Sequence, residues 1–327
     1  YYSGGYFFVA GPYAGAASPA QGGGRLSAGL VGNWGQKPFK YAPPKGFLPL
    51  NSATARPNKV VPRPDQYVGI TTYTGTNAST RTIPTEFEAD LVWIKSRNLT
   101  RNNVLYDTVR GATKKLLSNA PNAEQTDTDG VKAFLENGVK IGNVAEVGSE
   151  QGYVMWHWKA GGDKNTFNVD DVGYASAAAA GLTAGTITPT GASVNTKSGF
   201  SIIRYTGGSN GASDSVPHGL GRTPGLILHK NLDASANWNI KHSGFQSNYG
   251  AAFTTTQPQN VTTDYSGGGF ADLTSDTTFG FLSGTSNANN VNENGVDYIC
   301  YIWADVPGLQ KFGTFTGNGN EDGPFVE

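Results

Sequence analysis

The sequence predicts an all-β protein made of tandem antiparallel β-sandwich repeats of jelly-roll-like type, joined by short linkers rich in Pro and Gly. Gly contributes 45 of the 327 residues and charged residues only 15%, a balance typical of many short strands joined by tight turns. Seventeen Pro residues disfavour helix interiors, because Pro removes a backbone donor. A strand-turn-strand pattern also recurs along the chain.

The recurring pattern defines the repeats. Its first copy is residues 69–75 (GITTYTG) followed by 91–95 (LVWIK), and its second is residues 201–207 (SIIRYTG) followed by 226–230 (LILHK). A third start lies at residues 312–317 (FGTFTG). Matching positions are offset by 132 residues at the Tyr-Thr-Gly turn, 135 at the Lys that ends the second strand and 145 at the last strand. A growing offset indicates loop insertions in a common scaffold.

The first repeat is predicted to span residues 67–162. After the two strands of the pattern we expect a third strand at residues 103–110 and a hairpin at 134–141, with its turn at Asn137-Gly138. Residues 153–159 (YVMWHWK) close the repeat. Their nearly continuous apolar character predicts a strand that is covered on both faces.

The second repeat is predicted to span residues 200–307, after a connection at 163–199 whose short Ala run is below helix length. When the two repeats are aligned by their last strands, Trp303 corresponds to Trp158, and we expect these two residues to anchor two separate cores. Residues 308–327 supply a strand at the start of a truncated third repeat.

The N-terminal part is predicted to be incomplete. Residues 1–50 offer two strands, which cannot close a core by themselves. Residues 51–66 contain three Pro residues and are predicted to form a semi-rigid spacer. Because the chain begins at Tyr1 and its one Met is Met155, we expect it to be an internal piece of a longer protein.

Charge, hydropathy and cysteine content exclude several classes of protein. A net charge of −1 without a block of Lys or Arg disfavours nucleic-acid binding. No run approaches the ~18 apolar residues of a membrane helix, so we expect no membrane insertion. The one cysteine, Cys300, cannot form a disulfide within the chain. Its apolar neighbours predict a packed thiol.

The candidate metal ligands have simpler explanations. Asp127 and Asp129 lie in a DTDG segment that resembles a calcium loop, but the EF-hand spacing is absent and a polar turn is favoured. The histidines lack ligand-type spacing, which favours structural roles and no zinc site. They are His157, His218, His229 and His242.

The candidate catalytic groups are equally weak. Ser243 follows His242, but adjacency does not make a triad, and residues 219–225 lack the ending of a phosphate loop. Glycoside hydrolysis needs two carboxylates that face each other, which a sequence cannot show. The candidate pairs are Asp170 with Asp171, Glu86 with Glu88, and Glu321 with Asp322. We therefore expect no catalytic, metal or cofactor site.

Loops rich in Asn, Gly and Ser could bind sugar hydroxyls beside aromatic rings. Residues 207–211 and 283–295 are the two examples. Ordinary hairpin loops have the same composition, and this explanation is favoured at each of them.

Two stretches resemble known families. Residues 33–47 (NWGQKPFKYAPPKGF) resemble the closing segment of SPRY-type sandwich domains in structural proteins of marine bacteriophages. Residues 67–326, with phrases such as GYVMWHWKAGG and YICYIWADVPGLQKFGTFTGNG, resemble a repeated module of tail-fibre and other virion proteins of marine phages. In such proteins this module often follows a SPRY-like domain.

The resemblance implies a non-enzymatic structural protein on the surface of the virion, used as a tail fibre or appendage for host attachment. The implied partners are other virion proteins, further copies of the chain in a homo-oligomer, expected to be a trimer, and host surface glycans or proteins. A capsid decoration protein, a carbohydrate-binding receptor protein, a polysaccharide depolymerase and a bacterial surface adhesin remain as alternatives.

Overall fold

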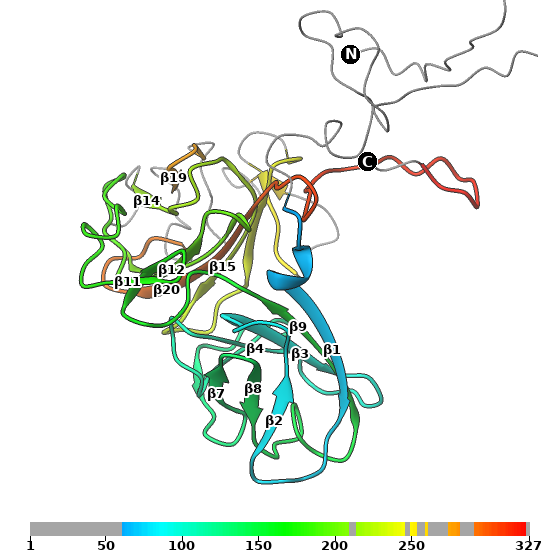
Figure 1. Cartoon of the computed structure of the whole chain (residues 1–327). Coiled ribbons are helices and arrows are strands. Elements are labelled where there is room, and N and C mark those ends of the chain that lie inside the picture. Colours follow the sequence, from blue (N-terminus) through cyan, green and yellow to red (C-terminus); the bar gives the residue numbers. More distant parts are fainter. Residues whose placement is uncertain are drawn as a thin grey trace, which may run out of the picture. The chain divides into compact units, whose positions relative to one another are not determined.

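The computed structural model describes residues 61–208, 214–245, 249–253, 259–260, 274–281 and 291–324 (Figure 1). The chain divides into two units, and all described residues lie in the second, Lys59–Glu327. The predicted N-terminal strands, and the spacer up to residue 60, lie outside the described residues. Residues 61–63 lead into a 3-10 turn, η1 (Pro64–Gln66). None of the described helical segments has the length and hydropathy to cross a membrane.

The first nine strands form two sheets that pack face to face, here called the first sandwich. The larger sheet is antiparallel, in the order β1-β9-β3-β4-β5-β6, and β2-β8-β7 covers one of its faces over a buried apolar cluster. β7 and β8 form the predicted hairpin, but its loop is Glu136 and Asn137, one residue earlier than the expected turn. The strands are β1 (Val68–Thr74), β2 (Arg81–Pro84), β3 (Leu91–Ser96), β4 (Val104–Asp107), β5 (Lys114–Leu117), β6 (Gln125–Thr126), β7 (Val131–Leu135), β8 (Gly138–Ile141) and β9 (Gly152–Trp158).

The remaining strands form the second sandwich around a seven-stranded sheet in the order β11-β10-β12-β13-β20-β15-β16. The pairs β14-β19 and β17-β18 are separate two-stranded sheets, and a second apolar cluster packs between the large sheet and β14-β19. β10 and β12 are the one parallel pair among the neighbours of the large sheet. The strands are β10 (Phe167–Val169), β11 (Val172–Tyr174), β12 (Gly191–Asn195), β13 (Phe200–Thr206), β14 (Ser215–Pro217), β15 (Pro224–Asn231), β16 (Asn239–His242), β17 (Tyr249–Gly250), β18 (Gln259–Asn260), β19 (Thr278–Gly280) and β20 (Asp297–Ala304).

Two sequence predictions fail in these segments. Residues 163–199 are more than a connection, because β10, β11 and β12 extend the second large sheet. These strands are only three to five residues long, which is too short for a clear alternating pattern. The strand expected at residues 312–317 does not form, and Phe315 in this segment is 69% exposed. That this segment begins a third repeat stays a prediction.

The strand register confirms the correspondence of the last strands. Val68 of β1 pairs with Trp158 of β9, and Phe200 of β13 pairs with Trp303 of β20. In both sheets the closing strand lies between the first strand and the second strand of the repeated pattern. The two tryptophans therefore occupy equivalent places in the two large sheets.

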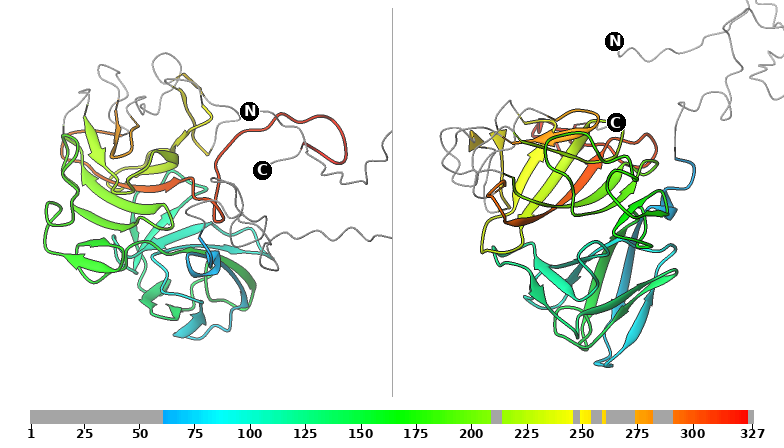
Figure 2. Two further views of the ribbon diagram at one scale, coloured as in Figure 1. Left: turned by 45° about the horizontal axis from the view of Figure 1, so that its top comes forward. Right: turned by 90° about the vertical axis from the view of Figure 1, so that its left-hand side faces the viewer.

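The outer faces of the two large sheets pack against each other (Figure 2). In β3, alternate residues point to opposite faces, so Val92 enters the first sandwich and Leu91 enters this shared interface. The rings of Trp158 and Trp303 meet there at 5.9 Å between centroids. The expectation that the two residues anchor separate cores is wrong, because equivalent positions on sheets packed back to back face the same interface.

Burial on two faces differs between the two closing strands. β20 is buried from Tyr298 to Ala304 because clusters cover both of its faces. In β9 only alternate residues are buried, and Val154 and Trp156 keep partial exposure. The prediction of a strand covered on both faces therefore fails over part of β9.

A buried polar network crosses the shared interface. The Tyr301 hydroxyl of β20 donates to Asp107 Oδ2 at the end of β4, at 2.6 Å. Arg110 forms an ion pair with the same oxygen at 2.5 Å and donates from Nη2 to the Tyr301 hydroxyl at 3.2 Å. The side chains of Asp107 and Arg110 are fully buried, so each depends on these partners.

We expect Tyr301→Phe to lower the free energy of unfolding by about 2 kcal/mol, because it removes a buried hydrogen bond to a charged group. Urea denaturation of the full chain measures this change. Tyr73→Phe is the matched control, since its hydroxyl donates to the neutral Val147 carbonyl, and should cost about 1 kcal/mol. Equal losses in the two variants would contradict a special role for the network.

Candidate functional site

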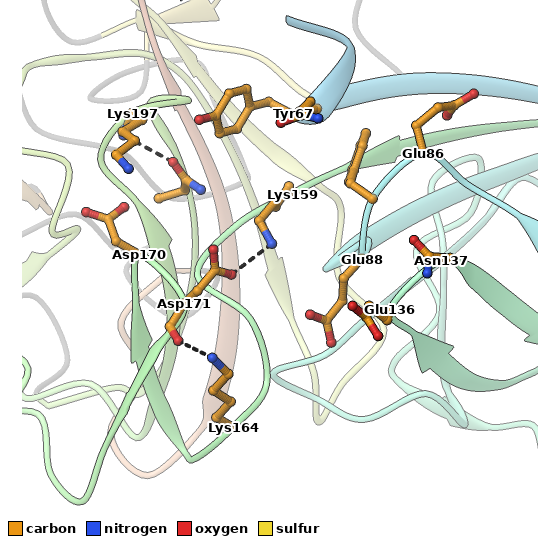
Figure 3. Close-up of a pocket in the computed structure, with 13 residues that line it drawn as sticks. Tyr67, Glu86, Glu88, Glu136, Asn137, Lys159, Lys164, Asp170, Asp171 and Lys197 are labelled. Atoms are coloured by element: carbon orange, nitrogen blue, oxygen red, sulfur yellow. Dashed lines mark hydrogen bonds and ion pairs between the residues drawn. The ribbon is translucent and has the colours of Figure 1, made fainter. Parts of the chain in front are cut away.

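A polar pocket of about 490 Å³ lies between loops of the two sandwiches (Figure 3). This volume is within the range of small-molecule binding sites. The first sandwich contributes the β2-β3 connection and the β7-β8 turn, and the second contributes the β10-β11 turn and residues after β12. The lining residues are Gln66, Tyr67, Glu86, Phe87, Glu88, Glu136, Asn137, Lys159, Lys164, Asp170, Asp171, Asn195 and Lys197.

Carboxylates dominate the wall that the first sandwich provides. Phe87 is buried and packs on His157 at 5.0 Å between ring centroids. Its two neighbours, Glu86 and Glu88, remain less buried and line the pocket, as does Glu136 of the hairpin loop. Within the described part of the chain these three carboxylates make no ion pair. The pKa of Glu88 is raised, mainly by burial and then by Asp163.

The opposite wall is a hairpin turn whose carboxylates already have partners. Asp170 and Asp171 join β10 to β11 with φ values of 49° and 66°, which a two-residue type I′ turn requires at both positions. Asp170 accepts hydrogen bonds from the Thr196 backbone N at 2.8 Å and hydroxyl at 2.6 Å. Asp171 pairs with Lys159 at 2.8 Å, and Lys164 donates to the Asp171 carbonyl at 2.6 Å.

Asp90 fixes the floor of the pocket to the first sandwich. Its Oδ2 accepts hydrogen bonds from the backbone N of Ala160 at 2.7 Å and of Gly162 at 3.2 Å, and its Oδ1 accepts one from the Thr108 hydroxyl at 2.9 Å. These bonds hold the segment that carries Lys159. Complete burial raises the pKa of Asp90 to about 7, although the hydrogen bonds oppose this shift.

The structure brings together two of the three carboxylate pairs singled out in the sequence. Glu86 and Glu88 lie on one wall and Asp170 and Asp171 on the other. The third pair, Glu321 and Asp322, is exposed in the C-terminal segment and does not line the pocket.

The DTDG segment is a turn whose carboxylates bind lysines. Asp127 pairs with Lys115 at 3.0 Å and accepts a hydrogen bond from Tyr106 at 3.0 Å, whereas Asp129 pairs with Lys132 at 2.7 Å. Across the described residues, no group of three His, Cys, Asp or Glu side chains is placed to hold a metal ion.

The four histidines occupy separate places. His229 contacts the Tyr205 hydroxyl at 2.8 Å in the second core, and His218 contacts the Ser275 carbonyl at 3.1 Å. Burial lowers the pKa of His157 to about 4 and that of His229 to about 3, so both are neutral at pH 7. The fourth, His242, accepts a hydrogen bond at Nδ1 from the Gly244 backbone N at 2.9 Å.

The other sequence candidates contribute structure or lie outside the described residues. Cys300 is buried in β20, and burial raises the pKa of its thiol. Residues 219–225 connect β14 to β15 and extend into the start of β15, and Gly219 and Gly221 in them have positive φ. Ser243 lies in the turn after β16. Residues 209–211 and 283–290 of the two polar loops lie outside the described residues.

Several pocket residues could not be found by reading the sequence. Glu136, Lys159, Lys164 and Lys197 come from three segments of the chain: the β7-β8 loop, the connection between β9 and β10, and the residues after β12. The one useful signal was the hairpin turn at Asn137-Gly138, which placed Glu136 at an exposed loop. The pocket exists because the two sandwiches pack against each other, and no local sequence pattern predicts that packing.

Comparison with known proteins places most of the chain in one family. A domain of unknown function, DUF7483, matches residues 63–327 and so spans both sandwiches. No curated protein and no solved structure matches the chain.

The raised pKa of Asp90 predicts a pH-dependent stability. The folded pKa of about 7 lies above the ordinary 3.8, so the folded state binds the proton more tightly. This stabilisation is fully present below pH 4 and is lost as the pH rises through 7. Relative to Asp90→Asn, the free energy of unfolding of the unmodified chain should fall by on the order of 4 kcal/mol between pH 4 and pH 8.

Urea denaturation of both proteins at several pH values measures this difference. Because other titrating groups are common to the two proteins, their contributions cancel. A constant difference between the two proteins across this range would contradict the assignment.

Proposed function

We propose that this chain, which belongs to the DUF7483 family of domains of unknown function, is a non-enzymatic host-attachment protein on the surface of a bacteriophage virion. The resemblance of residues 67–326 to phage virion modules supports the virion part of the proposal. The polar pocket supports the attachment part and is the observation that carries it.

The pocket has the features of a site that binds a hydrophilic ligand such as a surface saccharide. The bonds of Asp170 to Thr196 and of Asp171 to Lys159 hold one wall in place before the ligand arrives, which reduces the entropic cost of binding. Amides and charged groups line the pocket together with the rings of Tyr67 and Phe87. Such groups can donate to and accept from sugar hydroxyls.

Attachment through single pockets of this kind is expected to be weak, and we propose that a homotrimer multiplies the contacts into avidity. Light scattering of the full chain at micromolar concentration should give a mass of about three times 34.4 kDa. A monomer mass under these conditions would contradict the trimer.

Polysaccharide binding tests the function itself. We expect the full chain to bind members of an array of bacterial surface polysaccharides, and Lys164→Met combined with Lys197→Met to weaken that binding about tenfold, because both exposed lysines line the pocket. Lys311→Met, on the exposed C-terminal segment, is the matched control. Binding that survives the double variant would place the attachment surface elsewhere, and no binding to any polysaccharide would favour a capsid decoration protein.

Immunogold electron microscopy of particles that carry the chain tests its location. Label at the tail or at projecting fibres is expected for an attachment protein. Label spread over the shell would contradict this proposal and favour decoration of the capsid.

A polysaccharide depolymerase is the second candidate, and one observation favours it. Glu88 has a raised pKa, as a general acid needs, and a second carboxylate, Asp171, lies on the other wall in an ion pair with Lys159. Release of reducing ends from the bound polysaccharide, abolished by Glu88→Gln, would establish this activity. If the polysaccharide stays intact after prolonged incubation, the depolymerase candidate is excluded and binding is the remaining function.

A further inference from the structure

The charges of the pocket are separated between its two walls. Glu88 and Glu136 come from loops of the first sandwich and lie on one side of Figure 3, whereas Lys164 and Lys197 come from the second sandwich and lie on the other. Both lysines are exposed, as is Glu136, and Glu88 is half-buried. A ligand in the pocket therefore meets carboxylates on one side and ammonium groups on the other.

The ion pairs within the pocket do not involve these two carboxylates and two lysines, which are therefore available to a ligand. On the second wall Asp171 is neutralised by Lys159, and Asp170 is held by Thr196. The ammonium of Lys164 contacts only a neutral carbonyl among the described residues, and Lys197 forms no ion pair there. Two unpaired carboxylates thus face two unpaired ammonium groups.

The placement of Glu88 favours a cation beside it. Its carboxylate is partly removed from water, and the negative charges of Asp163 and Asp171 nearby are only partly offset by Lys159 and Lys164. A cationic group on a ligand would relieve both effects, and a charge-assisted hydrogen bond would add to the attraction. A neutral sugar would offer neither compensation.

We infer that the pocket takes a saccharide that carries both a free amine and a carboxylate, with the amine toward Glu88 and Glu136 and the carboxylate toward Lys164 and Lys197. This inference rests on the proposed function, because it names the class of glycan that the attachment site recognises. A polysaccharide with one charged group of each sign in its repeat unit has this chemistry.

Four simple sugars separate the contributions of the two charges. Muramic acid carries an amine and a carboxylate, N-acetylmuramic acid only the carboxylate, glucosamine only the amine, and N-acetylglucosamine neither. Ligand-observed saturation-transfer NMR with the full chain measures the dissociation constant of each. We expect muramic acid to bind about tenfold more tightly than either singly charged sugar, and N-acetylglucosamine most weakly.

Variants assign each ligand charge to its wall. Glu88→Gln should raise the dissociation constants of muramic acid and glucosamine about fivefold and leave that of N-acetylmuramic acid unchanged. The reason is that only the amine faces that wall. Lys164→Met should instead weaken the binding of muramic acid and N-acetylmuramic acid and leave the binding of glucosamine unchanged. Glu150→Gln and Lys311→Met, exposed residues outside the pocket, are the matched controls and should change nothing.

The outcomes separate this inference from the proposed function. Equal binding of all four sugars, or equal effects of Glu88→Gln on all of them, would overturn the inference and leave polysaccharide binding intact. Absence of binding for all four would also overturn it, while the polysaccharide array tests attachment independently. The proposed function fails only if the array shows no binding either.

Discussion

The back-to-back packing of the two large sheets is the constraint on which the rest of the structure depends. Each sandwich has its own core on one face of its large sheet, and the opposite faces share a third cluster that includes Trp303 and packs against Trp158. Apolar packing is not directional, so it leaves the relative placement of the sheets loosely specified. The bonds of Tyr301 to Asp107 and Arg110 favour one placement, because any other would leave the buried Tyr301 hydroxyl without these partners.

The pocket is a consequence of that docking. One wall belongs to the first sandwich and the other to the second, and Asp90 joins them by binding the backbone of residues 160 and 162. Neither sandwich alone presents both sets of charges. A single family domain that covers both sandwiches agrees with a site that needs the two together.

The electrostatics of the pocket also depend on the tertiary structure. Asp170 and Asp171 appear in the sequence as a free acidic pair, yet Thr196 and Lys159 occupy their oxygens. The carboxylates that remain available are on the other wall, where burial raises the pKa of Glu88.

The sequence by itself determined the all-β class, the hairpin before β8 and the correspondence of Trp158 with Trp303, because turn residues and strand periodicity are local properties. It missed β10 to β12, which are too short for a clear alternating pattern. Only the tertiary structure decided that the two tryptophans share one interface and that segments remote along the chain build one pocket. The physical reason is that these contacts form between sheets. An apolar residue in a strand predicts that it will be buried, but not which surface will cover it.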